Sequence, residues 1–162
     1  MTAKTHAPAV DLAQVVRQHA HRLGEPAQYR IWSTAPRSSL NAFRRREFTG
    51  WLVGWGDGNR ETAIEEISMV EPQAVDARTE VSVYLTTDGR LITTVNLLLG
   101  ERRTVFDSAP DQWATYGGDH GTLAAAANWL DAVRRELTPA IAPEAIDAAL
   151  EHAERVIVGA PQ

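Results

Sequence analysis

The feature that most constrains the fold is residues 79–99, where apolar and polar side chains alternate on both sides of a Thr-Asp-Gly triplet at 87–89. Alternation of this kind is typical of strands with one buried face, and Asp-Gly is a common hairpin turn. A two-residue loop would pair Leu85 with Ile92, and the apolar side chains of the two strands would not form one continuous face. A three-residue loop pairs Leu85 with Leu91 and builds one continuous apolar face, so we predict this register.

The predicted register also pairs Val83 with Thr93 and Val81 with Val95. It requires Gly89 in the left-handed region, which glycine adopts without a steric penalty. The opposite face of the hairpin carries more polar side chains: Glu80, Ser82, Tyr84, Thr86, Arg90 and Asn96. We therefore expect one buried face and one face open to water or to a polar partner.

Helices are predicted on both sides of this hairpin in the sequence. The first spans residues 12–23, where Asp11 provides the N-cap and Gly24 ends the helix. A longer helix is predicted over residues 122–137. Pro143 suits the first position of a last helix, because proline lacks the N–H that this position leaves unpaired.

Two strands are predicted before the hairpin, over residues 29–33 and 47–55. Glycines and polar residues at 56–59 then favour a turn. In the longer strand, three large side chains are expected to share one face because they lie two residues apart: Trp51, Val53 and Trp55.

The remaining segments carry weaker patterns. Residues 60–70 fit a bulged strand or a short helix, and the strand is favoured. Residues 72–78 are predicted to form a loop. After a turn at 100–103, residues 104–107 are expected to add a short strand. A short helix, capped by Ser108, is predicted to end at Gly117-Gly118.

Together these elements predict a single α+β domain over residues 1–162, with residues 1–9 as a tail outside the fold. Helical patterns come first and last, and strands are grouped between them without regular strand-helix alternation. This grouping indicates an antiparallel sheet of about four to six strands, with an N-terminal helix and C-terminal helices packed on one face.

Composition narrows the functional classes. The 162 residues include no cysteine, which excludes thiol catalysis and thiolate metal sites, and the net charge is −5. The sequence has neither a secretory signal pattern nor an apolar run of membrane-spanning length, so we expect a cytoplasmic protein. Arginine is strongly preferred over lysine and alanine is abundant, which indicates a GC-rich bacterial genome.

One basic cluster is interleaved with aromatic residues. It comprises Arg37, Arg44, Arg45 and Arg46, followed by Phe48 and Trp51. Arginine grips phosphate and aromatic rings stack on bases, so a nucleic acid or a phosphate-bearing ligand is one possible partner. The alternative is a solvated sheet edge, where charged side chains discourage unwanted strand pairing. We favour the sheet edge.

A glycine-rich segment, residues 117–122, contains Asp119 and His120. A glycine-rich loop before a helix can bind anions, and a histidine there can transfer protons. The same sequence is also expected where two glycines end one helix and a capping residue starts the next, and we favour this explanation. His19 and His21 are two residues apart on a predicted helix, which is unsuitable for chelating a metal, so we predict neither metal nor cofactor.

The sequence contains no recognisable catalytic motif, and no family is recognised in it. We therefore predict a non-enzymatic bacterial protein that binds another protein, a second copy of itself as a homodimer, or both. Candidate contacts on a sheet face or edge are Trp51, Trp55 and Tyr84. Adaptor, chaperone-like and immunity-like accessory proteins belong to this class. The alternatives are nucleic-acid or phosphate-ligand binding through the arginine cluster, and a small enzyme that uses Asp119 and His120.

Overall fold

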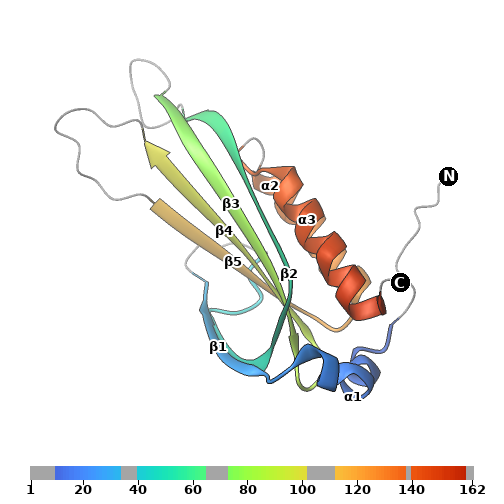
Figure 1. Cartoon of the computed structure of the whole chain (residues 1–162). Coiled ribbons are helices and arrows are strands. Elements are labelled where there is room, and N and C mark those ends of the chain that lie inside the picture. Colours follow the sequence, from blue (N-terminus) through green and yellow to red (C-terminus); the bar gives the residue numbers. More distant parts are fainter. Residues whose placement is uncertain (1–9, 34–39, 65–72, 102–111, 138–139, 160–162) are drawn as a thin grey trace.

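The computed structural model describes residues 10–33, 40–64, 73–101, 112–137 and 140–159. Within them, five strands form one antiparallel sheet in chain order: β1 (Ala27–Trp32), β2 (Arg45–Ile64), β3 (Gln73–Thr86), β4 (Leu91–Glu101) and β5 (Gln112–His120). The helices are α1 (Leu12–Leu23), α2 (Leu123–Leu137) and α3 (Pro143–Glu154), which continues into the π-helical turn η1 (Arg155–Gly159). Figure 1 shows α2 and α3 against one face of the sheet, so the predicted α+β class is confirmed.

The hairpin forms in the predicted register, with Leu85 opposite Leu91 and Val81 opposite Val95. The turn closes through a hydrogen bond of 2.9 Å from the Thr86 N–H to the Arg90 carbonyl. Gly89 has a φ of +88°, the left-handed conformation that the three-residue loop requires. Local turn chemistry therefore sets the alignment of the two central strands.

The hydrophobic core lies between the helices and the face of the sheet that they cover, which we call the inner face. The sheet contributes Val53, Val81, Val83, Leu85, Leu91 and Val95, and the helices contribute Leu123, Leu130, Val133, Ala145, Ile146 and Ala149. At the N-terminus, α1 begins at Leu12 as predicted, because the Asp11 carboxylate accepts the backbone N–H of Ala13 and Gln14.

The predicted turn at residues 56–59 is wrong, because β2 runs straight through it. Gly54, Gly56 and Gly58 alternate along the strand and lie beneath α3. A Cβ at Gly56 would be 2.2 Å from the Ala145 carbonyl oxygen. These glycines therefore allow the helix to approach the backbone of the strand, and they do not serve to reverse the chain.

The predicted common face for Trp51, Val53 and Trp55 is also wrong. Leu52 is opposite Tyr84 and Gly54 is opposite Val83, so Val53 is an extra residue in a β-bulge. Trp51 and Val53 are buried, whereas Trp55 is exposed. The inserted residue shifts the alternation by one position, and Trp55 moves to the other face of the sheet.

Further differences concern strands that extend beyond their predicted limits. β3 begins at Gln73 in the predicted loop, and β4 continues to Glu101 through the start of the predicted turn. The helix predicted before Gly117-Gly118 is wrong, because β5 pairs with β4 from Leu91↔His120 to Leu99↔Gln112. The pairing of β5 with β4 therefore outweighs the local sequence pattern that had favoured a helix.

The part of the ambiguous segment that is described, residues 60–64, is strand as favoured. Several predictions fall outside the described residues: residues 1–9, Arg37, residues 65–70, the strand at 104–107 and the cap at Ser108.

The sheet is curled. β1 and the first part of β2 bend over the face opposite the helices, the outer face, and approach β5 (Figure 1). The Ala42 N–H donates to the Gly117 carbonyl at 2.9 Å, and Arg46 meets Asp119 at 3.3 Å. The outer face is consequently enclosed at this end, and its open part lies farther along β2, β3 and β4.

Candidate functional site

The open part of the outer face centres on two large apolar side chains of β2. The exposed fractions of Leu52 and Trp55 are 47% and 44%, and the bulge brings Trp55 to the same face as Leu52. Beside them, the Arg78 guanidinium contacts Glu80 at 3.1 Å and Asp57 at 3.9 Å. We call Leu52, Trp55, Asp57, Arg78 and Glu80 the outer patch. It has an apolar centre and an ion-paired rim, as protein-binding surfaces do.

The other two predicted contact residues lie elsewhere. Trp51 is only 7% exposed, and its indole N–H donates to the Gly24 carbonyl at 2.8 Å, so it fixes the end of α1 to the sheet. Tyr84 is half-buried in the curl, with ring centroids 4.7 Å from Tyr29 and 5.4 Å from Phe48. Burial raises the pKa of the Tyr84 phenol. Of the three residues, only Trp55 is strongly exposed.

The outer patch borders a free strand edge. β1 pairs with β2 only over residues 45–50, and in the described part of the chain no strand pairs with that side of β2 from Trp51 to Ile64. An unpaired edge offers backbone N–H and C=O groups to a further strand. Trp55 and Leu52 thus lie on a strand that can accept backbone contacts along its free edge as well as side-chain contacts.

The predicted arginine cluster is divided. Arg37 lies outside the described residues, and Arg44 is exposed. The Arg45 guanidinium lies 5.0 Å from the Trp32 ring and pairs with Glu47, whereas Arg46 turns into the curl toward Asp119. Neighbouring residues of a strand point to opposite faces, so Arg45 and Arg46 do not share one surface for phosphate.

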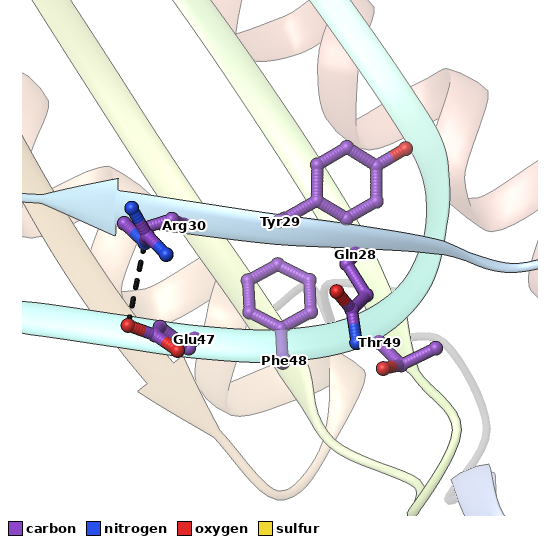
Figure 2. Close-up of a pocket in the computed structure, with 6 residues that line it drawn as sticks. All are labelled: Gln28, Tyr29, Arg30, Glu47, Phe48 and Thr49. Carbon is purple, nitrogen blue, oxygen red and sulfur yellow. Dashed lines mark ion pairs between the residues drawn. The ribbon is translucent and has the colours of Figure 1, made fainter.

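A hollow of about 410 Å³ lies on the β1–β2 ribbon (Figure 2). Its lining consists of Gln28, Tyr29, Arg30, Glu47, Phe48 and Thr49. Figure 2 shows the ion pair between Arg30 and Glu47, which measures 3.3 Å. Because Arg45 pairs with the same carboxylate, the charged groups of this hollow already neutralise one another in part.

Asp119 and His120 lie on opposite faces of β5. Asp119 meets Arg90 at 2.6 Å on the outer face. The His120 Nε2 lies 2.9 Å from the Thr93 Oγ1 on the inner face, beside the ring of Trp129. Burial lowers the pKa of His120 to about 4. The two side chains therefore do not face a common reactant.

The segment that contains them is not the predicted loop between two helices, because Gly117 to His120 belong to β5. The expected capping residue is present in Thr122, whose Oγ1 accepts the Ala125 N–H at 3.0 Å.

Among the described residues, no group of three or more histidine, aspartate or glutamate side chains could hold a metal ion. None of the helices in this part of the chain is both apolar and long enough to span a bilayer.

Leu52 and Trp32 were not among the predicted contact residues, although about half of each side chain is exposed, 47% and 53% respectively. Leu52 lies on the outer face because it alternates with the buried Trp51, whereas the bulge that brings Trp55 to the same face has no clear signal in the sequence. Comparison with known proteins adds no constraint: no family model matches the chain, and no curated protein or solved structure shows significant similarity to it.

Proposed function

We propose that this chain is a non-enzymatic, cytoplasmic bacterial protein that binds another protein through the outer patch. The observation that carries this proposal is the exposure of Leu52 and Trp55 on the face of the sheet opposite α2 and α3, beside the unpaired edge of β2. Exposed large apolar side chains that are grouped and rimmed by polar residues mark interaction sites more often than scattered ones do.

The chemistry of the outer patch fits a protein partner. Tryptophan contributes a large contact area at a small entropic cost, and it is frequent among residues that dominate binding energy. Strands β2 and β3 hold Trp55 and its neighbours in fixed positions, which reduces the ordering cost of association. The ion-paired rim of Asp57, Arg78 and Glu80 supplies polar groups that remain hydrated around the apolar centre.

Nucleic-acid or phosphate binding is the less favoured function. It would use the exposed Arg44 together with Arg45 and Trp32 on the β1–β2 ribbon. Glu47 lies between Arg30 and Arg45, and the chain carries a net charge of −5, both of which weaken phosphate binding. Binding of this type would fall steeply with salt and would be lost in Arg44→Glu/Arg45→Glu.

The proposal is tested by comparing two single variants of exposed tryptophans, Trp55→Ala and the control Trp32→Ala. A partner recovered from the source cells with the full chain as bait is titrated against each variant. We expect Trp55→Ala to weaken binding at least about tenfold, and Trp32→Ala to bind like the unaltered chain. Equal affinities for the three proteins would overturn the proposal.

A further inference from the structure

The free edge of β2 lies beside an acidic helix. α3 packs on β2 more extensively than on any other strand, and its charged residues are all acidic: Glu144, Asp147, Glu151 and Glu154. The glycines of β2 show which side of the helix lies over this strand. A Cβ at Gly58 would be 2.8 Å from the Glu144 carboxylate, and a Cβ at Gly56 would be 2.9 Å from the Cβ of Ala148.

Glu151 lies on the same side of α3 as Glu144, because seven residues make almost two helical turns. Arg155 pairs with Glu151 at 3.7 Å, which leaves the acidic residues of this helix in excess. The free edge of β2 therefore has carboxylates above its inner face, while Leu52 and Trp55 lie on its outer face.

From this arrangement we propose that the partner contributes an extended segment that pairs with the free edge of β2 and alternates basic with apolar side chains. This inference rests on the proposed function and specifies the partner of the same surface. Side chains of an added strand point alternately to the two faces of the sheet. Those on the helix side would meet Glu144 and Glu151, and those on the other side would pack beside Leu52 and Trp55.

A second copy of the chain fits this edge less well. If two copies paired antiparallel through β2, about a twofold axis perpendicular to the sheet, both α3 helices would lie on the same face of a continuous sheet, next to each other. Their facing sides would each present Glu144 and Glu151, and like charges repel. An extended segment without a helix avoids this repulsion, and basic side chains turn it into attraction.

The test selects peptides of about twelve residues, from a random library displayed on phage, that bind the full chain. We expect the selected sequences to carry lysine or arginine at alternate positions with apolar residues between them. The best peptide, made synthetically, should slow backbone amide exchange in β2 beyond Gly50. The variant Glu144→Gln/Glu151→Gln should bind this peptide at least tenfold more weakly, since it lacks the two carboxylates that attract the basic side chains of the peptide.

The matched control is Asp147→Asn/Glu154→Gln, which makes the same charge change on the outward side of α3 and should bind the peptide normally. If the affinity of selected peptides depends on Trp55 but neither on Glu144 and Glu151 nor on alternating basic residues, the inference is wrong and the proposed function stands. If peptide binding is independent of Trp55 as well, both are wrong. A dimer in light scattering whose β2 amides are already protected would also overturn the inference.

Discussion

Trp51 and Trp55 point to opposite faces of the sheet, although they are four positions apart and an even spacing on a regular strand would place them on the same face. The bulge at Val53 is the cause, because it adds one residue between them. One indole is thereby sealed in the core and donates to the Gly24 carbonyl, while the other reaches the outer patch.

This division predicts different effects on stability for the two tryptophans. Trp51→Ala should lower the free energy of unfolding by about 3 to 5 kcal/mol, because it leaves a cavity and removes the hydrogen bond to Gly24. Trp55→Ala should lower it by about 1 kcal/mol or less, since the side chain is 44% exposed. Urea denaturation of both variants measures the difference, and similar losses would contradict the assigned faces.

The glycines of β2 predict a second asymmetry. Gly56→Ala places a Cβ 2.2 Å from the Ala145 carbonyl oxygen, so α3 must move away from the sheet. We expect a loss of about 1 to 3 kcal/mol in thermal or chemical denaturation. Gly121→Ala is the matched control, because the added Cβ would meet only the Arg90 Nη1, in ordinary contact at 3.5 Å, and it should leave stability nearly unchanged. A harmless Gly56→Ala would show that α3 does not need this approach.

The buried imidazole predicts how stability depends on pH. The pKa of His120 falls from its ordinary value of 6.5 to about 4 in the folded chain, chiefly because burial disfavours the cation. The unfolded chain therefore binds a proton as the pH drops below 6.5, while the folded chain resists it until about pH 4. The contribution of the neutral His120 to the free energy of unfolding should be complete above pH 6.5. It should be lost as the pH falls from 6.5 to about 4, a total of about 3 kcal/mol.

His120→Gln removes the titrating group and retains a group that can bond to Thr93. Its free energy of unfolding should change less between pH 7 and pH 4 than that of the unaltered chain. Urea titrations at several pH values give both profiles. Parallel profiles would mean that other groups cause the acid sensitivity.

The carboxylate of Asp119 on β5 meets Arg46 from the curled part of β2 and Arg90 from the hairpin turn. Asp119→Asn should cost about 1 kcal/mol of stability at low salt and less at high salt, because partly exposed ion pairs are screened. Asp131→Asn serves as the control, since Asp131 pairs with arginines of its own helix. Equal losses in the two variants would indicate that the Asp119 contacts do not hold the curl.

Where local chemistry decides the structure, the sequence was sufficient. The Asp11 cap, the Gly89 turn and the register of Leu85 with Leu91 were all predicted correctly, because each depends on residues close together in the chain. The overall class followed from the grouping of helices and strands.

Where contacts between residues far apart in the chain decide the structure, predictions from the sequence were wrong. Glycines at 54, 56 and 58 have the composition of a turn, yet their spacing of two matches a strand face, and only the position of α3 shows why side chains are absent there. The strand at 112–120 depends on its pairing with β4. Of the outer patch, only Trp55 was predicted as a contact, and the bulge that turns it away from Trp51 has no clear signal in the sequence.

The most direct test of a binding surface at the outer patch is site-specific photo-crosslinking in the source cells. A photoreactive amino acid at position 55 is compared with the same residue at position 32, which is exposed on β1. The account predicts that position 55 yields a discrete covalent product with one partner protein, and that position 32 yields little of it. Equal yields of that product at the two positions, or no product at position 55, would contradict the account.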